Sequence, residues 1–548
     1  MNRAKLLSLL LVLLATAPLA VLRAAPALAS PQQVSVMMDD DLLVNGTDKR
    51  RDKALLQMKS LGVEYVRATV LWSVVAAATK PGHFNAGDPG AYPHHNWDRF
   101  DNLVRSATAD GIGVYFDVTG PGPRWAMGKA PPSQRKSQAT WMPNPVQFYR
   151  FVHAVGKRYS GTYHKELPKD HGLLPRVSFW SIWNEPNQGG WLTPQSYMSP
   201  TLGRVIPYAP ILYRRLYLMG RTALTATGHD KDFIAIGETS PTGRGAPSAR
   251  NPLAPKLFIR ELLCADPRGV PYTGVQASAR NCGDFARYGP LKAAAWAHHP
   301  YTRRSPPTAP PPAPDAITIA NLPDLTALLD QLSVTTGHIR SSSPGGLSVL
   351  ASEFGYETNP PDRFAGVTFT QQATWINQGD FFTYANPRVV GMTQFLLRDA
   401  APDRRHPKGS KAYYQTYQSG LLNGAGHRKP AYNAYMLPLV LYPAGKDPDT
   451  GVPLTGFWGQ LRFRPQSFAD LNAPDQVQIE YQAPGTTGWR GLGGPVMVSN
   501  GHHFFLGTLP NPGPGLIRAT WRAHTPPYVV MSRSAPVPND STPFQLTP

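Results

Sequence analysis

The sequence is poor in several features that would point to a particular class of protein. It has only two cysteines in 548 residues, and no histidine accompanies them in the spacing of a metal site. It contains no H-E-x-x-H motif and no phosphate-binding loop of the G-x-x-x-x-G-K type. Beyond residue 29 no stretch is long and apolar enough to span a bilayer. We therefore expect no metal, no cofactor and no membrane span.

Charged residues are also few, at 16% of the chain, and acidic ones are scarcer than basic ones. The formal net charge is +19, and nearly all of the excess precedes residue 451, because residues 451–548 hold six Lys+Arg against four Asp+Glu. Such a charge makes nucleic acid, anionic membrane or acidic polysaccharide conceivable partners. No long Lys/Arg block and no nucleic-acid motif accompanies the charge, so a solvated basic surface is favoured and no nucleic-acid partner is expected.

Residues 1–29 have the pattern of a signal peptide. Arg3 and Lys5 precede an apolar run at Leu6–Leu14, and Ala27-Leu28-Ala29 fits a small-residue cleavage site. No twin arginine precedes the apolar run, which favours the general secretion route. We expect a secreted protein, extracellular or associated with the cell wall.

The two cysteines fit that compartment. Cys264 and Cys282 are close in sequence, and an even count in an exported protein predicts a disulfide. The alternative is a metal or nucleophile site, which two cysteines without paired histidines do not favour.

The rest of the chain divides into two regions by pattern. Residues 30–442 alternate short apolar strands with helical stretches, which is typical of a parallel α/β fold. Strands are expected at 33–38, 63–70, 112–118, 177–183, 232–237, 293–299, 347–353 and 389–396. Helices are expected at 50–61, 97–110, 145–158, 207–227, 322–339 and 369–385, and a last one should open at Lys429-Pro430. Eight such units fit a closed (β/α)8 TIM barrel better than an open dinucleotide-binding sheet, whose glycine fingerprint is missing.

Residues 443–548 have a different sequence pattern, which predicts strands without intervening helices. A linker is expected at 443–449, and short alternating strands broken by Gly/Pro turns follow it, which predicts a small immunoglobulin-like β-sandwich. Trp458, Trp489 and Trp521 are either core residues or a carbohydrate-binding platform, and core tryptophans are the commoner case.

The stretch V-S-F-W-S-I-W-N-E-P-N-Q-G-G-W, residues 177–191, carries the clearest chemical signal. Its first half is apolar and rich in aromatic and β-branched residues, which indicates a buried strand, and Pro186 stops it because proline cannot donate a ladder hydrogen bond. Asn184 and Glu185 therefore lie side by side at the strand end, with Trp191 nearby. A carboxylate beside an amide and aromatic walls suits sugar chemistry. The alternative is a glutamate that caps a neighbouring helix.

A second carboxylate ends the seventh predicted strand. The apolar run L-S-V-L-A-S leads into Glu353-Phe354-Gly355, three β/α units after Glu185. Glu357 is the nearest competitor, but it lies beyond the turn. Catalytic residues of such barrels come from the C-terminal ends of strands, where both glutamates are expected.

Other predicted strands also end in polar or aromatic residues. Arg67 lies inside strand two, where an arginine is costly to bury unless a carboxylate pairs with it. Trp125 follows strand three and either stacks on a sugar or packs beneath its loop. Glu238 ends strand five, as a second candidate carboxylate or, by preference, a partner for Arg or Lys. His299 ends strand six and Tyr301 follows it, in the sequence H-P-Y.

These motifs resemble those of the clan A glycoside hydrolases, (β/α)8 barrels with catalytic glutamates on strands four and seven. W-N-E-P, extended by Asn187 and Trp191, is most similar to the cellulase-like (family 5) and β-xylosidase-like (family 39) branches. The resemblance covers roughly residues 33–440. It implies that Glu185 is the acid/base and Glu353 the nucleophile.

The resemblance also implies supporting roles. Arg67 matches an arginine that supports the nucleophile, Tyr301 a tyrosine that hydrogen-bonds it, and His299 a histidine that lines the sugar site. Asn184 is expected to hydrogen-bond the sugar 2-hydroxyl.

The chain departs from family 5 at two strands. Strand three lacks the histidine that is frequent there, and strand eight lacks the tryptophan that serves as a sugar platform. Phe395 or Gln394, together with Arg398 and Asp399, is expected to take the place of that tryptophan.

The predicted function is therefore that of a secreted, monomeric, retaining glycoside hydrolase that cleaves β-glycosidic bonds of a poly- or oligosaccharide by double displacement. Retention predicts carboxyl groups about 5–5.5 Å apart. Two close carboxylates cannot both ionise freely, so a raised pKa is expected for Glu185 and a lowered pKa for Glu353. The alternative class is a non-catalytic secreted carbohydrate-binding or cell-wall adhesion protein that uses the barrel as a scaffold. Intact carboxylates at both strand ends count against it.

Overall fold

The computed structural model describes residues 30–164, 172–342, 345–462, 475–498, 501–522 and 529–539. The predicted signal peptide, residues 1–29, lies outside the described residues. No helix in the described part of the chain combines the length and the apolar character needed to cross a membrane.

Eight parallel strands form a closed barrel, as predicted. Around the barrel each strand pairs with its sequence neighbours, and β1 pairs with β12 to close the ring. The strands are β1 (Val34–Met38), β2 (Tyr65–Leu71), β3 (Gly113–Thr119), β4 (Phe179–Ile182), β7 (Phe233–Thr239), β9 (Ala295–His298), β11 (Ser348–Phe354) and β12 (Val389–Phe395). Their bounds agree with the predicted ones to within a few residues, because strands buried on both faces are apolar throughout.

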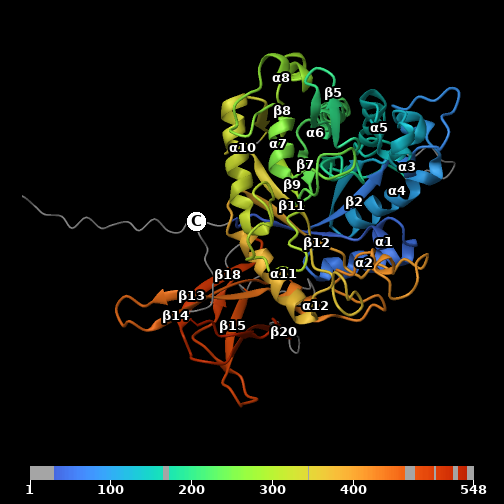
Figure 1. Ribbon diagram of the computed structural model, residues 1–548. Helices are drawn as coiled ribbons and strands as arrows, with labels where there is room; N and C mark the ends of the chain where they lie inside the picture. Colours follow the sequence, from blue (N-terminus) through green and yellow to red (C-terminus); the bar gives the residue numbers. More distant parts are fainter. Residues whose placement is uncertain are drawn as a thin grey trace, which may run out of the picture.

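Helices surround the strands (Figure 1). The main ones are α2 (Asp48–Ser60), α4 (His94–Ala109), α5 (Pro145–Arg158), α6 (Ala209–Ala226), α10 (Leu322–Thr336), α11 (Phe369–Tyr384) and the short last helix α12 (Pro430–Met436). Local chemistry sets their starts. The side chain of Asn144 accepts hydrogen bonds from the first turn of α5, with Pro145 at its first position, and Thr368 and Gln371 form a capping box on α11.

The loops carry further short elements that the sequence did not predict. They are α1 (Asp40–Leu43), α3 (Trp72–Val75), α7 (Pro255–Leu262), α8 (Gly274–Ala279), α9 (Asp284–Tyr288), β5 (Ser196–Ser199), β6 (Arg204–Pro207), β8 (Leu291–Ala293) and β10 (Ile339–Ser341). Strands β5 and β6 form an antiparallel hairpin in the excursion after β4.

The inside of the barrel is filled by side chains from alternating strand positions. Tyr115 and Phe179 stack with ring centroids 4.3 Å apart, and small residues, among them Ala235 and Ala295, belong to the same buried cluster. Large rings need small neighbours at native packing density, so this layer is closed. Polar strand-end residues are therefore held above a packed floor.

Two antiparallel sheets follow the barrel and confirm the β-sandwich. One holds β13 (Leu439–Lys446), β14 (Pro453–Gln460) and β18 (Phe504–Pro510). The other holds β15 (Gln476–Gln482), β16 (Arg490–Gly491), β17 (Val496–Met497), β19 (Leu516–Arg522), β20 (Val529–Met531) and β21 (Ala535–Pro536). The predicted boundary at 442/443 falls inside β13. The prediction of a linker at 443–449 is wrong for its first half, because the backbone there pairs with β14.

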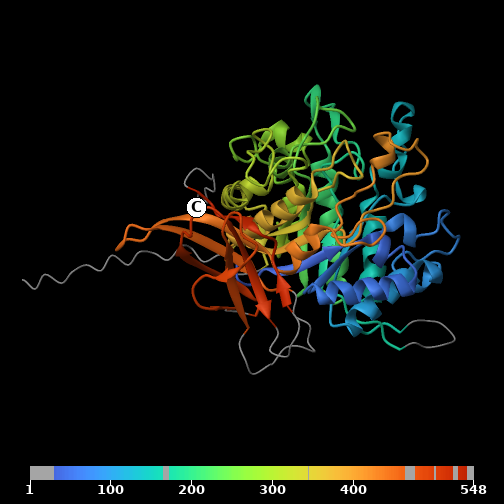
Figure 2. The ribbon, with the colours of Figure 1, turned by 90° about the horizontal axis from the view of Figure 1, so that it is seen from below.

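The two sheets lie beside the barrel in both views (Figures 1 and 2), and strand β13 of the first sheet contacts helix α11. Trp458 is buried between Phe381 and Tyr384 of α11, with ring centroids 5.4 Å from each. Arg462 forms a bidentate pair with Asp380 of the same helix. Trp521 is also buried, so these two tryptophans are core residues and no carbohydrate platform includes them.

The predicted disulfide is confirmed. Cys264 and Cys282 are bonded with their Cα atoms 5.9 Å apart, and they close the excursion that holds α8 between β7 and β9. The structure thus excludes the alternative of a metal or nucleophile role for these thiols.

Replacing both cysteines by serine should lower the free energy of unfolding by about 3 kcal/mol, because the cross-link restricts the unfolded chain. Urea denaturation of Cys264→Ser/Cys282→Ser beside the wild type measures this difference. Mass spectrometry of the wild type without reductant should find no free thiol. An unchanged midpoint, or two free thiols, would contradict the assignment.

Candidate active site

The segment after β4 places Glu185 at the mouth of the barrel. Trp183 and Glu185 both have positive φ angles, 70° and 37°, which are uncommon for residues with a side chain. Strained backbone of this kind tends to cluster at functional sites. Gly120 permits the turn, since a Cβ there would lie 2.6 Å from the ring of Trp183. The side chain of Glu185 remains 21% exposed, which leaves it accessible from the mouth.

Asn187 holds this segment to the end of β7. Its amide donates to the carbonyl oxygens of Ser240 and Leu253, at 3.1 and 2.9 Å, and accepts from the backbone N–H of Ser240 at 2.9 Å. The backbone N–H of Glu185 also donates to the carbonyl oxygen of Glu238, at 2.9 Å. The position of Glu185 is thus fixed by hydrogen bonds to β7 and to the loop that follows it.

Arg67 lies at the centre of the site and is completely buried. Its Nη1 donates to Glu353 at 2.9 Å, and its Nη2 lies 3.2 Å from both Asp117 and Glu238. Nη2 also donates to Oδ1 of Asn184 at 2.9 Å. Arg67 thus makes both kinds of contact expected from the sequence. It pairs with the buried acids Asp117 and Glu238, and it contacts Glu353, the expected nucleophile.

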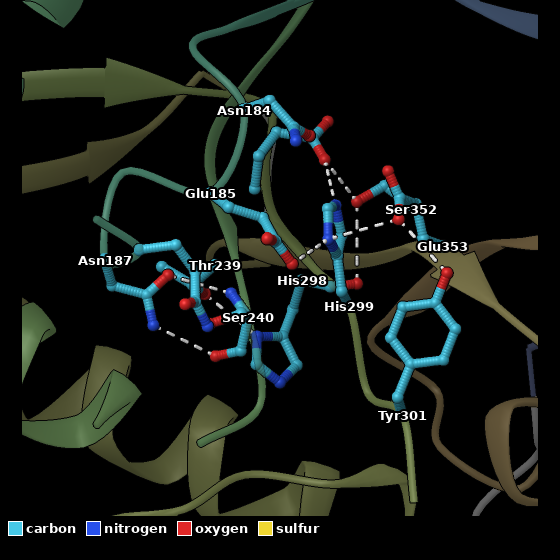
Figure 3. A network of polar contacts seen from close by, with 12 residues as sticks. Asn184, Glu185, Asn187, Thr239, Ser240, His298, His299, Tyr301, Ser352 and Glu353 are labelled. Carbon is cyan, nitrogen blue, oxygen red and sulfur yellow. Dashed lines mark hydrogen bonds and ion pairs between the residues drawn. The ribbon is translucent and has the colours of Figure 1, made fainter. Parts of the chain in front are cut away.

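His299 connects three glutamates. Its Nδ1 lies 3.0 Å from Glu185 and 3.5 Å from Glu353, and its Nε2 lies 2.7 Å from Glu238. Figure 3 shows the imidazole ring between the carboxylates of Glu185 and Glu353. Because one ring atom contacts both carboxylates, their nearest oxygens are at most about 6.5 Å apart, the sum of the two distances. The two glutamates therefore share one face of the barrel.

Tyr301 completes the surroundings of Glu353. Its hydroxyl donates to Oε2 of Glu353 at 3.1 Å, while Arg67 contacts Oε1, so each carboxylate oxygen has a donor. Phe395 lies beside Tyr301 with ring centroids 6.2 Å apart. The structure brings together Arg67, Asn184, Glu185, His299, Tyr301, Glu353 and Phe395, all named from the sequence.

The charges of this cluster set its protonation. Burial disfavours a charged imidazole, but the adjacent carboxylates of Glu353, Glu185 and Glu238 outweigh it and raise the pKa of His299 to about 10. At neutral pH the ring is therefore an imidazolium. Glu238 is fully buried, yet Arg67 and His299 hold its pKa well below the ordinary value.

The expectation of a lowered pKa for Glu353 is wrong. Burial raises its pKa, and the positive charges of His299 and Arg67 only partly offset this effect. The neighbouring charges of Glu185 and Glu238 raise it further. The partners of Glu353 are predictable from the sequence, whereas its burial is not.

Glu238 has a larger part than the sequence suggested. It pairs with Arg67 as expected, but it also accepts hydrogen bonds from Tyr115, His299 and Ser352, the last two at 2.7 Å. A positive φ of 48° at the end of β7 accompanies this position. It thus orients the imidazole ring from the side opposite the mouth.

The remaining predicted residues lie outside this contact network. Trp125 packs against Trp72 and Phe84 and donates to the carbonyl oxygen of Ala77 at 3.0 Å, which favours a packing role. Trp191 is half-buried in the loop after β4.

Two expectations for the end of β12 are also revised. Gln394 donates to backbone carbonyls, which leaves Phe395 as the residue of β12 nearest the site. Asp399 is buried in an ion pair with Lys429 at 2.6 Å, so that it supports the loop.

Among the described residues, no group of three or more His, Cys, Asp or Glu side chains has the arrangement of a metal site. The cluster can instead support acid–base and nucleophilic chemistry, because it places two carboxylates, one partly exposed and one buried, on either side of a single cation.

No family model and no curated protein matches the sequence. Among solved structures, a family 39 glycoside hydrolase from Bacteroides cellulosilyticus WH2 is similar with a TM-score of 0.46 and 13% identity, covering 88% of this chain and 79% of that one. A monomeric beta-xylosidase from Caulobacter crescentus CB15 has a TM-score of 0.45 and 14% identity, with coverages of 88% and 97%. A glucosidase from Croceicoccus marinus has a TM-score of 0.46 and 12% identity, with coverages of 86% and 82%. Likenesses this distant carry no argument about activity, which rests on the site itself.

Glu238→Gln should lower the pKa of His299 by about one to three pH units, because an opposite charge in contact with the ring is lost. NMR titration of ring-labelled histidine measures the change. Ser352→Ala is the matched control, since it removes a neutral hydrogen bond to the same carboxylate oxygen. Equal shifts in both variants would contradict an electrostatic role.

The same variant has a pH-dependent effect on stability. The pKa of His299 is about 10 in the folded protein, against an ordinary value of 6.5. Protonation of His299 therefore stabilises the fold fully below pH 6.5, and this stabilisation is lost as the pH rises through about 10. Glu238→Gln should therefore destabilise the protein more at about pH 6 than at about pH 10, as measured by urea denaturation. An equal loss at both pH values would contradict this coupling.

Proposed function

We propose that this protein is a secreted retaining glycoside hydrolase that cleaves β-glycosidic bonds of a poly- or oligosaccharide by double displacement. The observation that supports it best is the contact of Glu185 and Glu353 with the same nitrogen of His299, which limits the gap between their nearest oxygens to about 6.5 Å. Retaining enzymes have carboxyl groups about 5–5.5 Å apart, whereas inverting enzymes need about 6.5–9.5 Å to admit a water.

In the first step, an oxygen of Glu353 attacks the anomeric carbon while the bond from that carbon to the leaving oxygen breaks. Glu185 gives its proton to the leaving oxygen. Arg67 and Tyr301 hold one oxygen each of Glu353, which aims the carboxylate. The imidazolium of His299 lies 3.0 Å from Glu185 and holds this carboxyl group in place by a hydrogen bond, so that Glu185 is left as a carboxylate for the second step.

In the second step, Glu185 takes a proton from water, and the resulting hydroxide attacks the anomeric carbon and releases Glu353. Asn184 supports both steps. Because Arg67 occupies its Oδ1, the Nδ2 group is the part that faces a sugar, as a donor to the 2-hydroxyl.

The second candidate is a non-catalytic carbohydrate-binding or cell-wall adhesion protein. A binder does not need a buried carboxylate held by two donors at the mouth of the barrel, so the geometry favours the enzyme. A panel of β-linked polysaccharides and aryl β-glycosides, assayed for released sugar, separates the two and identifies a substrate. Binding without hydrolysis of any member would favour the adhesion protein.

On an aryl β-glycoside from that panel, Glu353→Ala and Glu185→Ala should fail differently. Glu353→Ala removes the nucleophile, so added azide should restore turnover with an inverted product. Glu185→Ala removes the proton donor, so poor leaving groups should slow by about 10²–10⁴-fold while activated ones still form the covalent intermediate. Azide then releases that intermediate with retention.

Glu64→Gln serves as the control, because this glutamate precedes β2 at the opposite end of the barrel, where it contacts Ser35 and His502. Its kinetics should equal those of the wild type. Identical small losses in both catalytic-site variants would refute the assigned roles.

Secretion has its own test. Cleavage after Ala29 should give a mature protein that begins at Ser30, which is buried and donates its backbone N–H to Tyr384 at 2.7 Å. N-terminal sequencing of protein exported by an expressing bacterium measures the cleavage site. An intact N-terminus on cell-retained protein would contradict export.

A further inference from the structure

A basic cavity lies in the loops of the barrel beside the segment that carries Glu185. Its volume is about 530 Å³. It is lined by Pro132, Ser133, Gln134, Arg135, Lys136 and Arg250. Every charged residue of this lining is a cation, and no carboxylate in the described part of the chain is within ion-pair distance of the three side chains. The cavity therefore has positive charge without an internal counter-charge.

The sequence around the cavity has the same bias. No Asp or Glu occurs in residues 118–165, 186–229 or 239–260, which cover most of the excursions after β3 and β4 and the first part of the excursion after β7. These three excursions otherwise carry many Arg and Lys residues. Because acids are missing over these stretches, the residues next to the cavity in sequence do not cancel its positive potential.

Contacts between the loops place the cavity next to the Glu185 segment. Gly189, four residues after Glu185, packs on the backbone of Arg250, since a Cβ there would lie 2.2 Å from its carbonyl oxygen. On the other side, Thr193 exchanges backbone hydrogen bonds with Thr140 and Met142, at 2.9 and 2.8 Å. The loop with Arg135 and the loop with Arg250 therefore flank the segment that follows Glu185.

We propose that this cavity binds an anionic group, a carboxylate or a sulfate ester, on the part of a glycan that leaves with the proton from Glu185. The proposal rests on the proposed function, because the acid/base residue marks the leaving-group side of the bond. Arg135 and Arg250 offer planar, bidentate donors to such an oxyanion, and Ser133 and Gln134 offer hydrogen bonds to neighbouring hydroxyls. The substrate would then be an acidic rather than a neutral polysaccharide.

Binding tests the site separately from catalysis. The probes are cellotetraose, its form oxidised to carboxylates at C6 and its form sulfated at C6, titrated calorimetrically into the full chain with Glu353→Gln so that none is consumed. At least one charged probe should bind about ten-fold tighter than cellotetraose at about 20 mM salt, and the preference should shrink at about 200 mM salt because exposed charges are screened. The charged probe that binds tighter identifies the anion.

Arg135→Ala/Lys136→Ala/Arg250→Ala should reduce that preference to about two-fold or less, because the three positive charges that attract the anionic probe are then absent. The matched control is Lys49→Ala/Arg50→Ala/Lys53→Ala, which removes three exposed charges from helix α2 and should keep the preference. Equal binding of all three probes, survival of the preference in the cavity variant, or its equal loss in the control would each overturn the proposal.

Kinetics then test the leaving-group side. With a charged oligosaccharide that the enzyme cleaves, the cavity variant should lose at least about ten-fold more kcat/KM than with a small neutral aryl glycoside, because only the former loses an ionic contact. Equal losses would place the cavity elsewhere on the substrate path and overturn that part of the proposal. Absence of all hydrolysis would instead refute the proposed function and leave the binding result to stand by itself.

Discussion

The burial of one positive charge, that of Arg67, is the constraint on which the site depends. A guanidinium removed from water is tolerated only when carboxylates pair with it and hydrogen bonds satisfy it. Glu353, Asp117 and Glu238 supply the charges from three different strands, and Asn184 supplies a further acceptor. The positions of Glu353 and Asn184 at the mouth are therefore tied to a charge buried inside the closed barrel.

A second cation, the imidazolium of His299, makes the crowding of acids tolerable. Glu185, Glu238 and Glu353 all contact its ring. Without a positive charge between them, three carboxylates this close together would repel one another and could not all be ionised. Burial still raises the pKa of Glu353. A bound sugar that develops positive charge at the anomeric carbon would favour the charged form of this carboxylate, so the cluster matches the transition state better than the resting state.

The barrel and the position of Glu185 and Glu353 at its mouth were predictable because both rest on local signals. Strands buried on both faces read as apolar runs, and a polar residue at the end of such a run must lie at the mouth. The hairpin β5–β6 and the short helices α7–α9 were not predictable, because their shape depends on contacts with other loops. The burial of Trp458 agrees with the commoner of the two roles expected for it, whereas the pKa of Glu353 was not predictable, because it depends on burial by distant segments.

Helix α11 belongs as much to the sandwich as to the barrel. Its outer face gives Phe381 and Tyr384 to the tryptophan of β14, and its Asp380 is neutralised by an arginine that follows that strand. The barrel and the sandwich are therefore joined by a common interface at α11 and are not two independent modules on a linker. A gene fragment that ends after α12 would encode a barrel with an exposed aromatic face on α11 and an unpaired carboxylate at Asp380. Fusion of this barrel to other domains is therefore disfavoured unless the sandwich is retained.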